Sequence, residues 1–144
     1  MNNDNHYPIN DSFLDRLIGN FKTVLSRFAQ FDGRARRREF WLFVLATTLL
    51  SAVAGIWDGI LFNGREIFEG FFDVVFFIPT LAVSVRRLHD TGRSGWWNLL
   101  VITFIGIPVL IYFLASEGDR FDNEYGEDPK VGVSFHDSAI DDLV

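Results

Sequence analysis

The sequence lacks most of the motifs by which enzymes and disulfide-bonded domains are recognised. It contains no cysteine, which excludes disulfide bonds and thiolate metal sites and leaves the redox compartment undetermined. The first twelve residues are polar and show no signal peptide. No nucleophile motif, phosphate-binding glycine loop or HExxH motif is present. We therefore predict no catalytic residue, no metal site and no cofactor.

Charged side chains are also absent from the apolar run between Phe40 and Trp57. As a helix, the 18 residues of this run span about 27 Å, which is close to the hydrocarbon thickness of a bilayer. The apolar character continues to Phe62. A first transmembrane helix is therefore predicted over about 40–62.

Two further apolar runs follow. The second predicted span covers 67–85, after a polar turn, and the third covers 96–115, with a kink at Gly106–Pro108. One kinked third span is favoured over a re-entrant hairpin because two halves of about ten residues are each too short to cross. The sequence thus predicts an all-α, small polytopic membrane protein, with three transmembrane helices in a transmembrane domain over 33–116.

An amphipathic helix is predicted ahead of these spans, over residues 13–30, where apolar residues recur at spacings of three and four. Ser12 and Asp15 resemble a capping box at its start, and Gly33 is the expected C-terminal cap. The cations off its apolar face fit a helix in the membrane interface. Packing on other helices of the protein is the alternative, and both can hold. Residues 1–12 are predicted to be disordered.

Charge is distributed unevenly along the chain. Residues 117–144 form an acidic polar tail with nine acids and two bases, whereas residues 1–116 carry a net charge of +1. The bases cluster at 34–38 and 86–93. Two intervening spans place both clusters on one side, and the positive-inside rule makes that side, with the N-terminus, cytoplasmic. A third span puts the tail outside, while a re-entrant third segment would return it to the cytoplasm.

Three blocks of the sequence resemble one protein family. These blocks are GRARRREFW (33–41), RRLHDTGRSGWW (86–97) and EGDRFDNEYGEDP (117–129). In this order they are similar to the bacterial inner-membrane family called domain of unknown function 805, the YhaH-like proteins, over about residues 20–130. Glu124 and Glu127 stand where that family often has Arg and Pro, so this tail is more acidic. The resemblance implies a few transmembrane helices in the bacterial inner (plasma) membrane and supplies no catalytic residues.

Arginines form the first candidate site. Guanidinium groups pair bidentately with phosphate oxygens, and the start of the third helix adds positive dipole character. We define the basic collar as Arg34, Arg36, Arg37, Arg38, Arg86, Arg87 and Arg93. Recognition of an anionic lipid headgroup is the functional hypothesis. Topology determination with unspecific lipid attraction is the alternative.

Three acids form the second candidate site. Asp58 shares a helix face with small and hydroxyl-bearing residues of the first span, and Glu69 and Asp73 do so in the second. If these faces meet, the three carboxylates gather near the outer end of the pair and form a cation or proton site. Alternatively, Asp58 and Glu69 reach the outer interface and leave Asp73 as the one intramembrane acid.

Three functions are considered from the sequence. The first is a non-enzymatic integral inner-membrane protein that binds membrane lipids, preferentially anionic ones, or a partner such as another membrane protein or a second copy. The second is an oligomeric small transporter or channel subunit that uses Asp73. The third is a lipid-modifying enzyme that uses His89 and Asp90, although Asp90, Thr91 and Gly92 are also typical of a turn. Basic residues at the membrane face argue against nucleic-acid binding.

Overall fold

The structure is a computed structural model that describes residues 12–130. Residues 1–11, which are all but the last residue of the segment predicted to be disordered over 1–12, and the tail beyond residue 130 lie outside this range. Within it, all regular structure is helical apart from an isolated bridge between Asn123 and Gly126. The predicted all-α class is therefore confirmed for the described residues.

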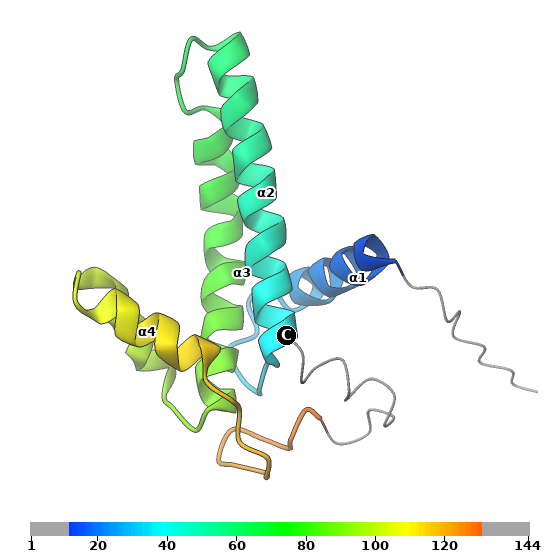
Figure 1. The fold of residues 1–144 in the computed structure, drawn as a ribbon, viewed down its shortest axis with the longest axis vertical. Helices are drawn as coiled ribbons and strands as arrows, with labels where there is room; N and C mark the ends of the chain where they lie inside the picture. The colour runs from blue at the N-terminus through cyan, green and yellow to red at the C-terminus, as the bar shows by residue number, and fades with distance from the viewer. Residues whose placement is uncertain (1–11, 131–144) are drawn as a thin grey trace, which may run out of the picture.

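Two long apolar helices form the body of the molecule. Helices α2 (Arg37–Leu61) and α3 (Phe68–Asp90) run side by side and are joined by a short turn (Figure 1). In this turn Asn63 and Gly64 have φ of 55° and 80°, the left-handed region that Asn and Gly tolerate best. Both helices are long and apolar enough to cross a bilayer. Of the most apolar 18-residue segment of each helix, 17% is buried within the protein in α2 and 22% in α3. They contain the two spans predicted over 40–62 and 67–85, apart from a residue or two at the turn.

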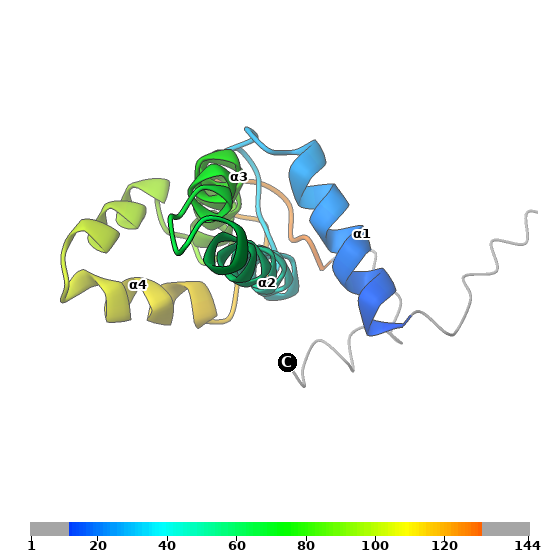
Figure 2. The same cartoon turned by 90° about the horizontal axis from the view of Figure 1, so that it is seen from above.

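We call the end of this pair where α2 begins and α3 ends the base, and the end with the turn the far end. Helix α1 (Phe13–Ser26) lies crosswise at the base (Figures 1 and 2). Its capping box is confirmed, because Ser12 Oγ accepts from Asp15 N at 3.2 Å and the Asp15 carboxylate accepts from Ser12 N at 3.1 Å. The helix ends four residues earlier than predicted, and Gly33, at φ 89°, lies in the following loop rather than at the cap.

Two short helices occupy the region predicted to be a third span. The 3₁₀-helix η1 (Gly95–Ile102) and helix α4 (Gly106–Ala115) form a hairpin on the opposite side of the base from α1 (Figure 2). Both ends of this hairpin lie at the base. A Cβ atom on Gly95 would come within 2.7 Å of Val85, and Ser116 O accepts a hydrogen bond from Arg37 Nε at 2.9 Å.

The chain reverses at residues 103–106. Thr103 Oγ1 donates to Leu100 O at 3.0 Å and accepts from Gly106 N at 3.1 Å, so its side chain caps the start of α4. A Cβ on Gly106 would overlap Leu100, so only glycine fits where the two short helices meet. The single kinked span predicted over 96–115 is therefore corrected to a hairpin, because the Gly106–Pro108 segment starts a second helix instead of bending a first.

The apolar core lies at the base. Phe21 of α1 stacks on Phe43 of α2 at 5.5 Å between ring centroids and meets Phe76 of α3 edge-on at 5.7 Å. The buried members of the core are Val24, Ala35, Phe40, Phe43, Val83, Leu88, Leu110 and Leu114. Because they come from α1, α2, α3, α4 and the loop before α2, burial of apolar surface holds these elements together at the base.

Candidate functional site

Helix α3 extends five residues beyond the predicted span, so Arg86–Asp90 lie on a helix and not in a loop. The helix ends in a Schellman motif. Gly92 N donates to His89 O at 3.0 Å and Arg93 N donates to Leu88 O at 2.9 Å. Gly92 has φ 65°, as the motif requires. The turn predicted at Asp90–Gly92 is therefore present as the C-terminal cap of α3.

Asp90 is the centre of a buried cluster of charged side chains. Arg34 Nε donates to Asp90 Oδ1 at 2.9 Å, and Arg87 Nη1 donates to Asp90 Oδ2. The Arg34 and Arg87 side chains are 1% and 0% exposed. Each carboxylate oxygen thus serves one guanidinium, and breaking such a buried pair costs about 3–5 kcal/mol.

Main-chain carbonyl groups accept from other nitrogens of these guanidinium groups. Arg34 Nη1 donates to Phe121 O at 2.7 Å. Arg87 Nε donates to Leu114 O at 2.9 Å and Arg87 Nη2 donates to Ser116 O. The last carbonyls of a helix lack intrahelical partners and carry the negative end of its dipole. Arg87 therefore holds the end of α4 on α3, and Arg34 holds the segment that follows α4.

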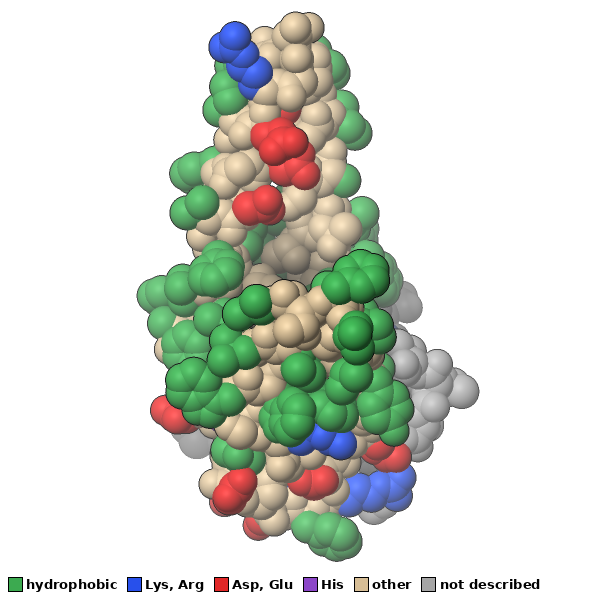
Figure 3. Space-filling model, turned by 90° about the vertical axis from the view of Figure 1, so that its left-hand side faces the viewer, with side chains coloured by type: hydrophobic (Ala, Val, Ile, Leu, Met, Phe, Trp, Pro, Cys, Tyr) green, Lys and Arg blue, Asp and Glu red, His purple; other side chains and the backbone are tan. Residues whose placement is uncertain are grey.

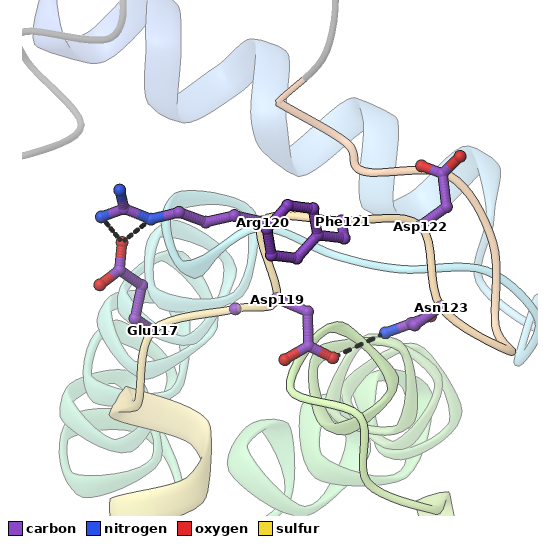
Figure 4. Close-up of a pocket in the computed structure, with 7 residues that line it drawn as sticks. Glu117, Asp119, Arg120, Phe121, Asp122 and Asn123 are labelled. Carbon is purple, nitrogen blue, oxygen red and sulfur yellow. Dashed lines mark hydrogen bonds and ion pairs between the residues drawn. The ribbon is translucent and has the colours of Figure 1, made fainter.

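We call residues 117–130 the C-terminal strap, because they close over the end of α3. Asp119 N donates to Asp90 O at 2.7 Å. Asn123 Nδ2 donates to His89 O at 2.9 Å and to Asp119 Oδ2 at 3.1 Å (Figure 4). Gly118 lies so close to Asp90 that a Cβ atom would overlap the carboxylate. The strap therefore approaches the cluster at a position where only glycine fits.

His89 contacts different residues from its neighbour Asp90. Its Nδ1 lies 3.2 Å from Gly33 O. Its ring stacks on Tyr125 of the strap, with centroids 3.9 Å apart and an interplanar angle of 6°. The two neighbouring side chains therefore have separate partners within the described residues.

Arg86 forms a second ion pair at the base. Its Nη1 donates to Glu39 Oε1 at 3.0 Å, and its side chain is 1% exposed. Its Nε and Nη2 atoms meet no acceptor within residues 12–130. The main-chain oxygen of Arg86 accepts from Ala35 N at 3.0 Å, so the loop before α2 is bonded to α3 as well.

The structure therefore divides the basic collar by environment. Arg34, Arg86 and Arg87 are buried with the partners described above. The Arg93 guanidinium lies over the Phe113 ring at 4.2 Å, a cation–π contact. The other three, Arg36, Arg37 and Arg38, line a pocket.

This basic pocket has a volume of about 560 Å³ and lies between α1, the start of α2 and the strap. Its cationic lining residues are Arg16, Arg36, Arg37, Arg38, Arg120 and Lys130, and Asp90 and Glu117 also line it. Phe13, Trp41, Leu42 and Leu45 give it an apolar side. Arg120 donates to Glu117 Oε1 at 2.8 Å (Figure 4) and lowers the pKa of that carboxyl group. Within residues 12–130, the lining thus combines more cationic than acidic side chains with an apolar helix face.

Asp58, near the far end, caps α3. Its buried carboxylate accepts from Phe68 N at 2.9 Å and from Glu69 N at 3.0 Å. Ile67 precedes the helix and has no side chain that can cap it. Asp58 therefore supplies from α2 the acceptors that the first N–H groups of α3 lack.

The other two acids of the predicted cation site belong to α3, where Glu69 is half-buried. The Glu69 carboxylate is close to Gly55, where a Cβ atom would lie 3.2 Å away. Asp73 is exposed, and acidic side chains are visible on the upper half of the pair (Figure 3). Among residues 12–130, no group of three His, Asp or Glu side chains is placed to hold a metal ion. The structure thus assigns the Asp58 carboxylate to helix capping, and the cation or proton site over Asp58, Glu69 and Asp73 stays a prediction.

Fold and site define a small helical protein with two membrane-length helices, closed at one end by buried arginines. The chain belongs to the family described as "Protein of unknown function (DUF805)", which matches residues 28–127. This confirms the resemblance carried by the three sequence blocks, which meet at the base. No solved structure matches the chain.

Three relatives from Escherichia coli (strain K12) are similar to this chain. Inner membrane protein YhaI is 41% identical over 113 residues, covering 78% of this chain and 96% of the relative. Inner membrane protein YhaH is also 41% identical over 113 residues, covering 75% and 93%. Uncharacterized protein YiiR is 29% identical over 141 residues, covering 74% and 90%. The similarity therefore extends over nearly the whole length of these relatives.

Proposed function

We propose that this protein is a non-enzymatic, multi-pass protein of the bacterial inner membrane, and that its basic pocket binds the headgroup of an anionic lipid. The names of YhaI and YhaH support the location. Two apolar helices of membrane length support insertion. The arginine-rich base lies on the cytoplasmic side together with the N-terminus, in accordance with the positive-inside rule.

The composition of the basic pocket carries this proposal. Among the residues that the structure describes, six cationic residues and two acidic ones line about 560 Å³. Arginine forks match phosphate oxygens, and clustered bases at a membrane surface attract anionic headgroups. Trp41, Leu42 and Leu45 lie on α2 next to this charge. A lipid whose phosphate lies among these cations therefore has its acyl chains along α2, the apolar helix that enters the membrane.

The non-enzymatic role is supported by how the titratable side chains of the base are used. Asp90 is held between Arg34 and Arg87, and the His89 ring contacts Gly33 O through Nδ1 and stacks on Tyr125. These contacts stabilise the fold. On this proposal the buried arginines build the base. The cations of the pocket bind lipid in addition to their contacts within the protein, such as those of Arg37 with Ser116 O and of Arg36 with Pro129 O.

Charge-matched variants test the lipid site. Arg16→Gln/Lys130→Gln removes two exposed cations that line the pocket, and Lys22→Gln/Arg27→Gln removes two exposed cations of the α1 region that do not line it. Each protein is placed in nanodiscs with a phosphatidylglycerol titration, and bound lipid is counted by native mass spectrometry. At about 1 kcal/mol per base, the pocket variant loses roughly 30-fold in affinity, whereas the control retains most of it. Equal losses in both variants would show unspecific attraction and contradict the proposal.

A further inference from the structure

The hairpin of η1 and α4 presents an apolar surface beside the base. Phe104 is 90% exposed, Ile105 83% and Ile102 78%. Figure 3 shows apolar side chains gathered over the part of the molecule beside the lower half of the pair. A contiguous apolar surface of this kind marks an interaction site, and three properties of the hairpin identify what covers it.

The first property is how the polar groups of the hairpin are satisfied. Residues 95–115 contain no charged side chain. At the reversal, Thr103 N donates to Leu100 O at 3.0 Å and Gly106 N donates to Thr103 O at 2.9 Å. Turns that face water are usually built from polar residues, whereas Phe104 and Ile105 form this tip. In a medium without water, backbone polar groups must bond within the protein and exposed side chains must be apolar, and the reversal of this hairpin has both properties.

The second property is the position of charged and interfacial side chains at the base of the hairpin. Arg93 Nη1 donates to Thr91 O at 3.2 Å, and its guanidinium lies over Phe113. Trp96 and Trp97 follow within four residues and are exposed. Arginine and tryptophan are typical of the boundary between headgroups and hydrocarbon. This boundary therefore passes through the start of the hairpin, with the tip on its apolar side.

The third property is the return of the chain to its starting point. Residue Ser116 bonds to Arg37 and Arg87, and the strap bonds to Asp90 and Arg34. A segment that crossed the bilayer would separate the strap from these partners by the membrane thickness, about 30 Å. The ten residues of α4 reach about 15 Å at most, and Figure 1 shows the hairpin inclined beside the lower half of the pair.

We propose that residues 95–115 insert into one leaflet only, the leaflet on the side of the base, where their apolar tip contacts lipid acyl chains. The strap then lies on the same side of the membrane as Arg34–Arg38. This inference does not depend on lipid binding in the basic pocket, since it rests on the hairpin and the strap.

Single cysteines test the topology, because the natural chain contains none. Asp32→Cys reports the loop at the base, Glu127→Cys the strap and Glu66→Cys the turn at the far end, all exposed positions. A membrane-impermeant maleimide is applied to spheroplasts and to inside-out vesicles. We expect Asp32→Cys and Glu127→Cys to react from one side and Glu66→Cys from the other. Reaction of Glu127→Cys from the same side as Glu66→Cys would overturn the proposal.

A spin label at Phe104→Cys tests the depth and the occupant. The protein is placed at one chain per nanodisc of phosphatidylethanolamine and phosphatidylglycerol, and relaxation by oxygen and by a water-soluble nickel chelate is measured. We expect the label at Phe104→Cys to have high oxygen access and low nickel access. A label at Val74→Cys, on the exposed surface of α3, is expected to behave in the same way. A label at Glu127→Cys on the strap is expected to show high nickel access. High nickel access would place the tip in water and overturn the proposal. Low access to both reagents would show cover by protein and overturn it as well.

Discussion

The two ends of the α2–α3 pair use buried charge in different ways. At the base, Asp90 lies between Arg34 and Arg87, whose other donors bind the end of α4 and the strap. At the far end, the Asp58 carboxylate accepts hydrogen bonds from two main-chain N–H groups of α3. The Asp90 cluster joins the loop before α2, α3, α4 and the strap through ion pairs and bonds to main-chain carbonyl groups, whereas Asp58 caps a single helix. We therefore expect changes at the base to affect stability more than changes at the far end.

The largest effect is expected for Asp90→Ala. It removes the shared counter-ion of Arg34 and Arg87, and loss of one partner from a buried pair costs about 3–5 kcal/mol. Thermal unfolding of the purified protein in detergent, followed by intrinsic tryptophan fluorescence, measures the loss. Asp73→Ala is the matched change at an exposed acid near the far end and is expected to leave the melting temperature almost unchanged. A similar drop in both variants would remove the distinction between the two ends.

A smaller effect is expected for Gly118→Ala. The added methyl group overlaps the Asp90 carboxylate, which cannot move freely because two arginines hold it, and overpacking of this kind costs about 1–3 kcal/mol. Gly59→Ala is the control, because a Cβ atom at this position of α2 meets nothing within 4 Å. In a helix interior that change stabilises by up to about 1 kcal/mol. Opposite shifts of the melting temperature are thus expected, and shifts of the same sign would contradict the geometry of the strap.

Asp58→Ala probes the far end directly. It removes both acceptors of the α3 cap, and loss of a cap costs about 0.5–2 kcal/mol. Hydrogen exchange measured by mass spectrometry is expected to increase in peptides that cover the first turn of α3 and to remain unchanged in those that cover Arg86–Asp90. Faster exchange at the base would mean that the two ends are coupled.

The smallest effect is expected for Tyr125→Ala in the strap. The stack on His89 is worth about 0.5–1.5 kcal/mol, as for other aromatic pairs. Limited proteolysis is expected to cut the strap faster in this variant, while the melting temperature changes little. Tyr125→Phe keeps the ring and serves as the control, so faster cutting in both variants would argue against the stack.

Local patterns were sufficient to predict much of the helical structure. The apolar runs located α2 and α3, and the Ser12–Asp15 spacing predicted the capping box of α1. The continuation of α3 to Asp90 was missed because the apolar run ends at Val85. Gly92 was the available signal, since a glycine just past the last turn is typical of a helix C-terminus.

The hairpin and the buried cluster depend on contacts that the sequence pattern does not display. Residues 95–115 have the length of one span, and their reversal rests on the side chain of Thr103 and the close packing at Gly106. Arg34 and Asp90 are 56 residues apart, so no local spacing relates them. Positive charge next to an apolar run did not show which arginines are enclosed by protein.

A double-mutant cycle on Arg34→Gln and Asp90→Asn tests the central claim most directly. Free energies of unfolding are measured in mixed micelles for the natural protein, both single variants and the double variant. If these side chains form the buried pair that fixes the strap to α3, the two changes are non-additive, with a coupling energy of about 1–3 kcal/mol. Additivity within about 0.5 kcal/mol would show that Arg34 and Asp90 act independently and would contradict the account of the base.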